Sequence, residues 1–313
     1  MKIDIRFFIC LLLMMSIAGC TSQEKKKSEE TVVAPAKPQN FERIFPPVMM
    51  TDPQERAGYM LEHFWDKFNF RDTMYCHTPE ITEQAFVDFL ALCPYVSSAK
   101  VSSAVKKMLD SAMVDVVMYN YFYKKGEHYL YEPNSPMRND EYFIPFLEHV
   151  VSVARVVEAD KVRPRYQLNL ANKNRIGVKA QNFTYTLNSG ATGNLYGISA
   201  KYVLLMFFNP DCTECRNTTA QLRSSSAVTA AVSAGTLKVL AVYPDENLEI
   251  WKKHINEIPA SWINSYDKAL SIRKDEIYDL KAIPTLYLLD KDKMVILKDT
   301  STGSIHEYLE KNP

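Results

Sequence analysis

Apolar residues recur at helical spacing through the first half of the chain, beyond about residue 50. Steps of three and four residues are typical of helices that bury one face. Asp52 and Pro53 predict the start of the first helix, with Asp52 as its N-cap and Pro53 at the first helical position. Gly126 and two prolines interrupt the pattern over 124–140, which predicts a long connection between four or five helices. The apolar stripes run through 57–68, 85–90, 101–119 and 143–157, and a last short helix is expected over 164–173.

From residue 176 the pattern changes to short strands and helices in alternation, which is typical of an α/β domain. Tyr202–Phe208 is a continuous apolar run that predicts a buried central strand. A helix is expected from Arg216 towards Val232. Further strands are expected over 183–187, 237–242, 286–289 and 294–297, further helices over 248–257 and 276–280, and turns over 190–197 and 290–293.

A short basic start and an apolar run over 7–18 open the chain. The run is shorter than the roughly 20 residues of a membrane-spanning helix and is typical of a signal peptide. It ends in Ile17-Ala18-Gly19-Cys20, which resembles the bacterial lipobox, whose cysteine is acylated and becomes the mature N-terminus. An ordinary signal peptide cut near Gly19 is the alternative. We expect export and lipid anchoring through Cys20 in the cell envelope, on the periplasmic side or at the outer membrane.

A length of 313 residues is about twice that of a typical domain and predicts two folded units with flanking segments. The segment after Cys20 carries a mixed run of Lys and Glu and then several prolines, so it is expected to be a solvated spacer. The predicted organisation is a signal peptide over 1–19, a flexible tether over 20–45, an α-helical domain over 46–174 and an α/β domain over 175–313.

The composition excludes several classes of protein. Lys and Arg total 37, as do Asp and Glu, so no net charge attracts nucleic acid or an anionic membrane surface. A hydrophobic content of 47% excludes wholesale disorder. Six cysteines are too few for a disulfide scaffold, so each is judged by its position.

The predicted helical domain offers little chemistry. Its histidines lack the spacing of metal ligands, so no metal site is expected. Cys76 and Cys93 flank one predicted helix, and either a disulfide or two separate thiols is compatible with the sequence. Its crowded aromatic residues are more typical of a core than of a ligand cage. The histidines are His63, His77, His128 and His149, and the aromatic residues are Phe64, Trp65, Phe68 and Phe70.

Two cysteines lie where the predicted central strand turns into a helix. Free backbone N–H groups at a helix start stabilise a thiolate, so Cys212 is the better nucleophile. Cys215, one turn further on, can attack a mixed disulfide at Cys212. Asp211 and Glu214 raise the cost of an anion there, whereas Arg216 lowers it, and the net sign stays open. A zinc site would need two further ligands, and a second C-x-x-C is absent from the sequence.

These motifs together resemble a known family. The apolar strand, the Cys212–Cys215 motif, the distant Ile283-Pro284-Thr285 and a hairpin at Asp290 resemble a thioredoxin-fold protein. The closest type is the TlpA-like, membrane-anchored thiol-disulfide oxidoreductases of bacterial envelopes. The helical domain resembles a domain of unknown function found ahead of such domains in Bacteroidetes lipoproteins. The expected fold is therefore an α/β thioredoxin-like C-terminal domain, with a central mixed sheet flanked by helices, preceded by an all-α domain.

The resemblance implies roles for individual residues. Cys212 would be the attacking cysteine and Cys215 the resolving one. Pro284 would be a cis-proline beside them, with the backbone of Ile283 pairing with a bound peptide. The helix over 248–257 fits the insertion of the TlpA-like type.

The chain also departs from the family pattern. Asp211 stands in place of an aromatic residue, and Thr213-Glu214 in place of a Gly-Pro or Glu-Pro pair. Met206 stands where minimal thioredoxins bury an acid, which leaves the proton acceptor unassigned.

Two functions follow from the sequence. The first is an envelope enzyme that reduces or isomerises disulfides of exported cysteine-containing proteins, without a cofactor, and is recharged by a membrane electron donor. The second is a lipid-anchored binding protein whose thioredoxin fold is a redox-inert scaffold. His254 and His306 are expected to be surface histidines.

Overall fold

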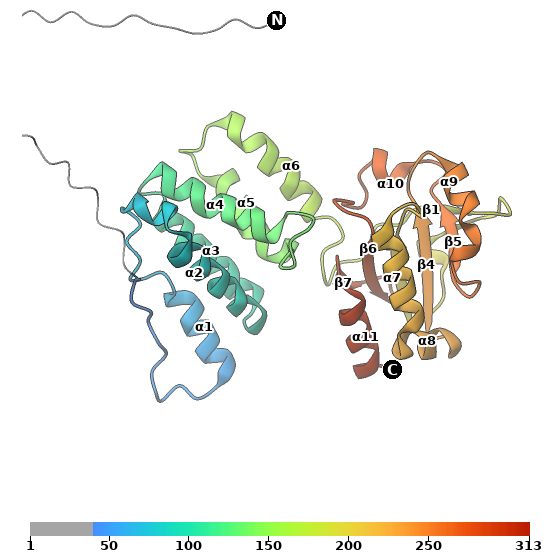
Figure 1. Cartoon of the computed structure of the whole chain (residues 1–313), viewed down its shortest axis with the longest axis horizontal. Coiled ribbons are helices and arrows are strands. Elements are labelled where there is room, and N and C mark those ends of the chain that lie inside the picture. The colour runs from blue at the N-terminus through green and yellow to red at the C-terminus, as the bar shows by residue number, and fades with distance from the viewer. Residues whose placement is uncertain (1–39) are drawn as a thin grey trace, which may run out of the picture. The chain divides into compact units, whose positions relative to one another are not determined.

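The computed structural model describes residues 40–313. The predicted signal peptide, Cys20 and most of the predicted tether lie outside the described residues. Helices alone occupy the described region ahead of residue 175 (Figure 1). They are α1 (Pro53–His63), α2 (Pro79–Leu92), α3 (Ser98–Ala112), α4 (Val116–Leu130), α5 (Asp140–Ser152) and α6 (Val162–Ala171), with short 3₁₀ turns between them.

Side-chain caps determine where these helices begin. Asp52 accepts a hydrogen bond from the backbone N–H of Glu55 at 2.7 Å, as its predicted role requires. Asp115 accepts in the same way from Val117 at 2.7 Å and so begins α4. The stripe over 101–119 is therefore two helices, α3 and α4, because a turn capped by Asp115 separates them.

The predicted long connection over 124–140 is wrong, because α4 continues to Leu130 and the connection is shorter. Gly126 lies inside α4 and faces the ring of Phe146 in α5. A Cβ atom at this glycine would lie 2.6 Å from that ring, closer than packing allows. The glycine therefore serves a close approach of two helices rather than a chain break.

The aromatic crowd after α1 is part of the core, as predicted. The Trp65 ring packs edge-on against Phe68 and Phe122, with ring centroids 5.3 and 5.0 Å apart. All three side chains are buried. Because α1 ends at His63, Trp65 and Phe68 belong to the turn that follows this helix, not to a longer helix as the stripe predicted, whereas Phe122 comes from α4.

A seven-stranded mixed sheet forms the second half of the chain. Its strand order is β2-β1-β5-β4-β3-β6-β7. β3 and β5 each run parallel to β4, whereas the other neighbouring pairs are antiparallel. The strands are β1 (Thr184–Leu187), β2 (Thr192–Asn194), β3 (Tyr202–Phe207), β4 (Leu237–Tyr243), β5 (Ile263–Tyr266), β6 (Thr285–Asp290) and β7 (Val295–Lys298).

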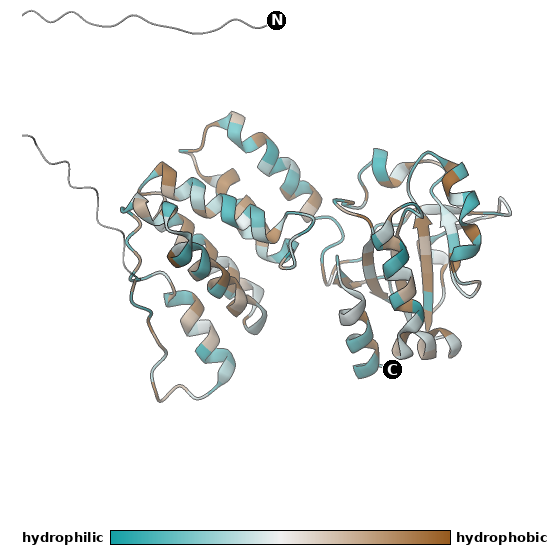
Figure 2. Cartoon of the chain, viewed as in Figure 1, coloured by the Kyte–Doolittle hydropathy of each residue, from teal (hydrophilic) through white to brown (hydrophobic). Residues whose placement is uncertain are grey.

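Helices flank this sheet, and its strand β4 is largely hydrophobic (Figure 2). The neighbouring strand β3 is buried at every position. Leu204 and Met206 pack with residues of α7, α8, α9 and α11 on one face. Val203 and Leu205 pack with Ile272 of α10 on the other. Burial on both faces explains the unbroken apolar run that predicted this strand. The helices are α7 (Thr213–Ser224), α8 (Ser226–Ser233), α9 (Leu248–Lys253), α10 (Ser271–Lys274) and α11 (Thr302–Lys311).

Several predicted elements of this region need correction. The predicted helix over 276–280 is absent from the described structure, because Glu276 has a left-handed φ of 49°. The helical turn lies earlier, at α10. The predicted turn over 190–197 contains the short strand β2. The helix expected from Arg216 begins earlier and is broken at Ser225, whose hydroxyl accepts from the first turn of α8.

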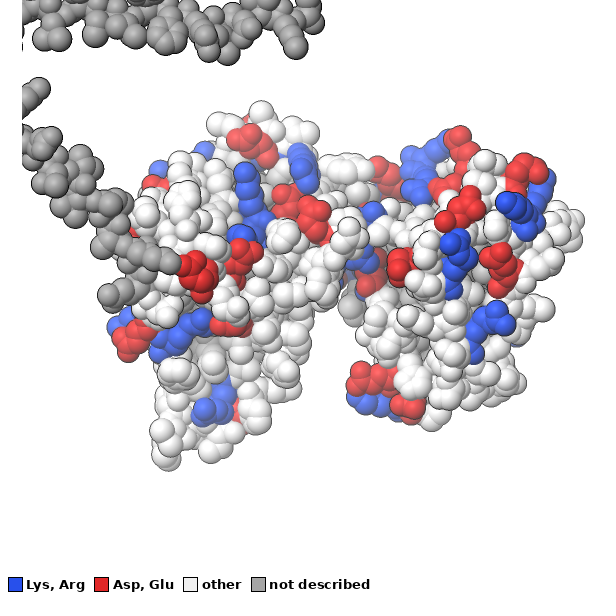
Figure 3. All heavy atoms as spheres, viewed as in Figure 1, with Lys and Arg blue, Asp and Glu red and all other residues white. Residues whose placement is uncertain are grey.

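A buried cluster of charges links α5 to the segments beside β6 and β7. Lys281 Nζ lies 2.6 Å from one carboxylate oxygen of Asp140, and Lys298 Nζ lies 2.9 Å from the other. Asp279 also pairs with Lys281, at 2.9 Å. Each of these four side chains is at most 6% exposed. By contrast, acidic and basic side chains are interspersed over the face shown in Figure 3, in keeping with a formal net charge of +0.

Candidate active site

Cys212 lies at the first turn of α7, directly after the loop that leaves β3. It is the N-cap residue, and its Sγ accepts the backbone N–H of Cys215 at 3.4 Å. The side chain is half-buried, so a reagent can reach the sulfur. The positive end of the helix dipole and a free N–H group therefore face this sulfur, as the sequence predicted.

Cys215 has the opposite surroundings. It is 1% exposed and packs in the core beneath α7. Burial raises the pKa of this thiol well above its usual range, although the N–H of Asn209, 3.4 Å from Sγ, acts in the other direction. Both cysteines are free thiols. The pair thus consists of one accessible and one protected sulfur.

Ile283 and Pro284 lie beside Cys212, although about seventy positions separate them in the sequence. The peptide bond between these two residues is cis, as the resemblance implied. The Sγ of Cys212 lies 3.4 Å from the carbonyl oxygen of Ile283 and can donate to it. Both residues are half-buried.

The three charged neighbours named from the sequence each have a polar partner. Arg216 donates to the carbonyl of Pro210 at 2.7 Å and so braces the loop ahead of Cys212. Glu214 accepts from the side-chain amide of Asn217 at 3.1 Å. Asp211 lies 3.4 Å from His254. The polar partners named here are residues other than the two cysteines. The modulating role of Asp211, Glu214 and Arg216 stays a prediction.

His254 lies beside the loop ahead of Cys212, a position that the sequence did not predict for it. Its side chain is 18% exposed, so the expected surface histidine is half-buried. Its two ring nitrogens face two carboxylates, with Nδ1 2.6 Å from Glu257 and Nε2 3.4 Å from Asp211. The three-residue spacing of His254 and Glu257 was visible in the sequence, but their approach to Asp211 depends on the tertiary fold. His306, 36% exposed and paired with Ser225 and Glu310, fits the expected surface position.

The cysteines of the helical domain are separate free thiols. Cys93 is buried, and burial raises its pKa to about 12. Cys76 lies against the sulfur of Met118 at 3.8 Å. The sequence left open a disulfide or two separate thiols, and in the structure Cys76 and Cys93 are separate thiols. No group of three or more His, Cys, Asp or Glu side chains within residues 40–313 is arranged to hold a metal ion.

The predicted lipid anchor and membrane attachment rest on residues that the structure does not describe. Within the described part of the chain, no helix combines the length and the apolar character needed to cross a bilayer. Cys20 therefore keeps its predicted role without a structural test.

Comparison with known proteins adds the family context. Residues 19–174 match a domain of unknown function (DUF5106), and residues 199–295 match a thioredoxin-like family model. The chain is similar to a thioredoxin-like protein from Bacteroides caccae, with 46% sequence identity and a TM-score of 0.85 over 88% of this chain and 99% of that one. No match was found among curated proteins.

Other solved structures cover the second half alone. The C-terminal domain of an uncharacterized protein from Bacteroides fragilis is 50% identical over 44% of this chain and 98% of that one, with a TM-score of 0.43. The thioredoxin domain of a thiol-disulfide oxidoreductase from Bacteroides vulgatus is 25% identical over 44% and 96%, with a TM-score of 0.39.

Proposed function

Because the chain belongs to the thioredoxin-like family, with a domain of unknown function ahead of the thioredoxin-like domain, we propose that it is a thiol-disulfide oxidoreductase. It reduces or isomerises disulfides of other proteins through Cys212 and Cys215. The observation that carries this proposal is the asymmetry of the two sulfurs. Cys212 is accessible at a helix start, whereas Cys215 is buried one turn away. A redox-inert staple would need no such difference.

The reaction follows from this asymmetry. The Cys212 thiolate attacks a client disulfide, one client sulfur leaves, and a mixed disulfide forms. The Cys215 sulfur then attacks Cys212, which releases the second client sulfur and leaves a Cys212–Cys215 disulfide. Two electrons have passed from the protein to the client. A membrane electron donor returns the pair to the dithiol, and during the reaction the backbone of Ile283 beside Pro284 pairs with the client chain.

The clients we propose are exported proteins that contain cysteine. The signal peptide and the lipobox-like Ile17–Cys20 support export and lipid anchoring in the cell envelope. Cys20→Ser tests the anchor, since the variant is expected to leave the membrane pellet of the native host. Retention of this variant in the pellet, with the parent's fatty-acid labelling, would contradict it.

Insulin reduction with a supplied thiol reductant tests the enzyme directly. Cys212→Ser is expected to lose turnover by at least about 100-fold, because only the thiolate is an effective nucleophile. Cys215→Ala should still react once and then accumulate as a mixed disulfide with insulin. Ser224→Ala, at the far end of α7, serves as the control and should match the parent. Equal turnover by the parent and Cys212→Ser would overturn the proposal.

A second candidate function rests on the helical domain. A largely apolar cavity of about 430 Å³ lies there, lined by Val116, Tyr119, Tyr123 and neighbouring residues. This cavity favours a lipid-anchored binding protein with a redox-inert thioredoxin scaffold. The insulin assay separates the two functions, since this candidate predicts that loss of either cysteine changes nothing.

A further inference from the structure

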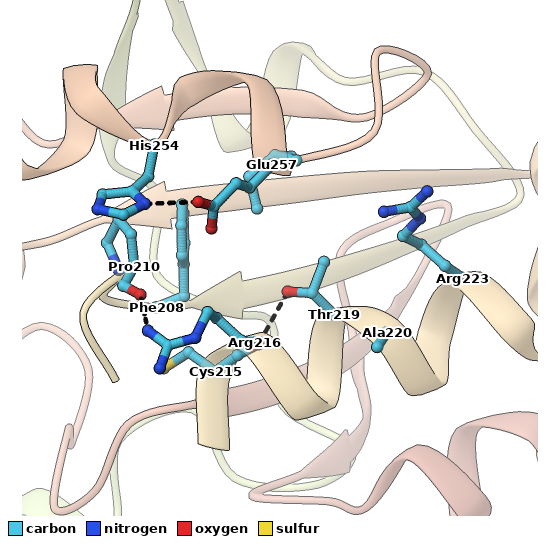
Figure 4. Close-up of a pocket in the computed structure, with 10 residues that line it drawn as sticks. Phe208, Pro210, Cys215, Arg216, Thr219, Ala220, Arg223, His254 and Glu257 are labelled. Carbon is cyan, nitrogen blue, oxygen red and sulfur yellow. Dashed lines mark hydrogen bonds and ion pairs between the residues drawn. The ribbon is translucent and has the colours of Figure 1, made fainter. Parts of the chain in front are cut away.

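A cavity of about 180 Å³ lies against the buried sulfur of the site, between α7 and the segment that follows α9 (Figure 4). Phe208, Pro210 and Ile258 give it apolar walls, and Cys215 contributes to its lining. Its volume exceeds what one water molecule needs, which is about 10–15 Å³ of such space. A water molecule can therefore fit into this cavity beside Cys215.

The cavity lies where the Cys215 thiol must release its proton. Its thiol must lose a proton before it can attack Cys212, because the thiolate is the nucleophile. Burial opposes that loss and raises the pKa of the thiol well above its usual range. Strand β3, which packs against Cys215, offers no proton acceptor on this face, because its side chains there are Met206 and other apolar residues.

The lining of the cavity holds one acceptor pair. Arg216 and Arg223 are cationic and can only donate, and the hydroxyl of Thr219 already donates to the carbonyl of Cys215 at 2.9 Å. His254 and Glu257 are the two lining side chains that can take up a proton. Resting on the function proposed above, we propose that the His254–Glu257 pair accepts the Cys215 proton through water in this cavity.

The arrangement of the pair suits this role. Glu257 Oε1 lies 2.6 Å from His254 Nδ1, and Figure 4 shows one carboxylate oxygen directed at the imidazole ring and the other pointing away from the ring, on the side of α7. Nε2 of the same ring faces Asp211 at 3.4 Å. A proton gained by the pair therefore forms an imidazolium between two carboxylates rather than an isolated cation.

The proposed step is a proton transfer followed by a thiol–disulfide exchange. With the client held on Cys212 as a mixed disulfide, the S–H proton of Cys215 passes through water to the His254–Glu257 pair. The Cys215 thiolate attacks the Cys212 sulfur and forms the Cys212–Cys215 bond. The bond from Cys212 to the client breaks, and the client sulfur leaves with the electron pair. The two charged groups that also face the cavity from α7, Arg216 and Arg223, carry no proton in this step.

The reaction of the reduced, purified chain with 5,5′-dithiobis(2-nitrobenzoate) resolves the relevant steps when parent and variants all carry Cys76→Ser, which removes the other half-buried free thiol of the described residues. The first thionitrobenzoate released reports attack by Cys212, and the second reports displacement by Cys215. Glu257→Gln is expected to slow the second release on the order of 100-fold at pH 7, the range of a lost general base. The deficit should shrink above pH 9, where hydroxide removes the proton. Glu257→Asp should recover part of the rate.

Glu249→Gln is the matched control, because Glu249 lies on α9, is 83% exposed and pairs with Lys252 outside the cavity. It should match the parent in both phases. A second phase in Glu257→Gln with the parent's rate and pH profile overturns the proton-acceptor role alone. Absence of the first phase from the parent would instead contradict the proposed function.

Discussion

Two sulfurs three positions apart experience different environments, and this difference governs the site. Cys212 is half-buried and touches the helix start and the Ile283 carbonyl. Cys215 is almost completely covered by the core under α7. The two thiols thus differ in reactivity for two reasons, because burial disfavours the thiolate form at Cys215 and the helix start stabilises it at Cys212.

Alkylation should reveal this division. At pH 7, iodoacetamide is expected to modify Cys212 first, whereas Cys215 should react far more slowly than free cysteine, because burial raises the pKa of its thiol and shields the sulfur. Because the raised pKa keeps Cys215 protonated, its reactivity should keep rising with pH beyond the point where free cysteine levels off. Peptide mass spectrometry after timed quenching measures both sites. Equal labelling at pH 7 would contradict the assignment.

At the scale of elements, the contact between α4 and α5 depends on a missing side chain. Gly126 lets the two helices approach until its Cα lies against the Phe146 ring, which is fully buried. The ring also packs against Phe86 of α2, with centroids 6.2 Å apart, so it has little room to move. Glycine inside a helix lowers its intrinsic stability, but at this position it allows the close packing of α4 on α5.

Gly126→Ala is therefore expected to lower the free energy of unfolding by about 1–3 kcal/mol, because overpacking outweighs the gain in helix propensity. Gly58→Ala is the matched control in α1. Its Cβ would meet only the mobile end of Lys100, so this variant should be neutral or more stable by up to about 1 kcal/mol. Urea unfolding measures both variants. Partial rescue of Gly126→Ala by Phe146→Leu is expected, and a stabilised Gly126→Ala would contradict the packing argument.

The same glycine shows why the sequence predicted some elements and not others. The Tyr202–Phe208 run and the Cys212–Cys215 motif are local patterns, and the strand-to-helix site they predicted is present. A glycine inside a helix looks like a break unless its neighbour across the core is known. The contact of His254 with Asp211 likewise joins segments far apart in the chain, which no local pattern encodes.

At the scale of the whole molecule, the buried charges connect the helical region to the site. Burial alone would raise the pKa of Asp140, but Lys281 and Lys298 outweigh this effect and hold that pKa below its usual range. Lys281 lies three positions before Pro284, so the cluster fixes the segment that carries the cis peptide. Lys298 also donates to the carbonyls of Ala171 and Lys173, at 2.9 and 3.0 Å.

Lys281→Met tests this connection, because it removes the ion-pair partner that the buried carboxylates of Asp140 and Asp279 share. We expect the free energy of unfolding at pH 7 to fall by about 3–5 kcal/mol, the usual cost of breaking a buried pair. Lys106→Met is the control, because its pair with Asp110 is 67% and 52% exposed and should matter by less than about 1 kcal/mol.

The pH dependence of Lys281→Met gives an independent check. A lowered pKa of Asp140 in the folded state means that its stabilisation is present above the ordinary aspartate pKa of about 3.9 and is lost as the pH falls through the folded value. The difference between the parent and Lys281→Met should therefore persist down to the ordinary aspartate pKa and narrow only below it, as Asp140 becomes protonated in the folded parent as well. A difference that stays equal from pH 7 to the lowest pH at which both chains fold would show that the lysine acts by packing rather than by charge. A difference below about 1 kcal/mol at pH 7 would show that the cluster does not stabilise the connection, since buried pairs of this kind otherwise cost several times that to break.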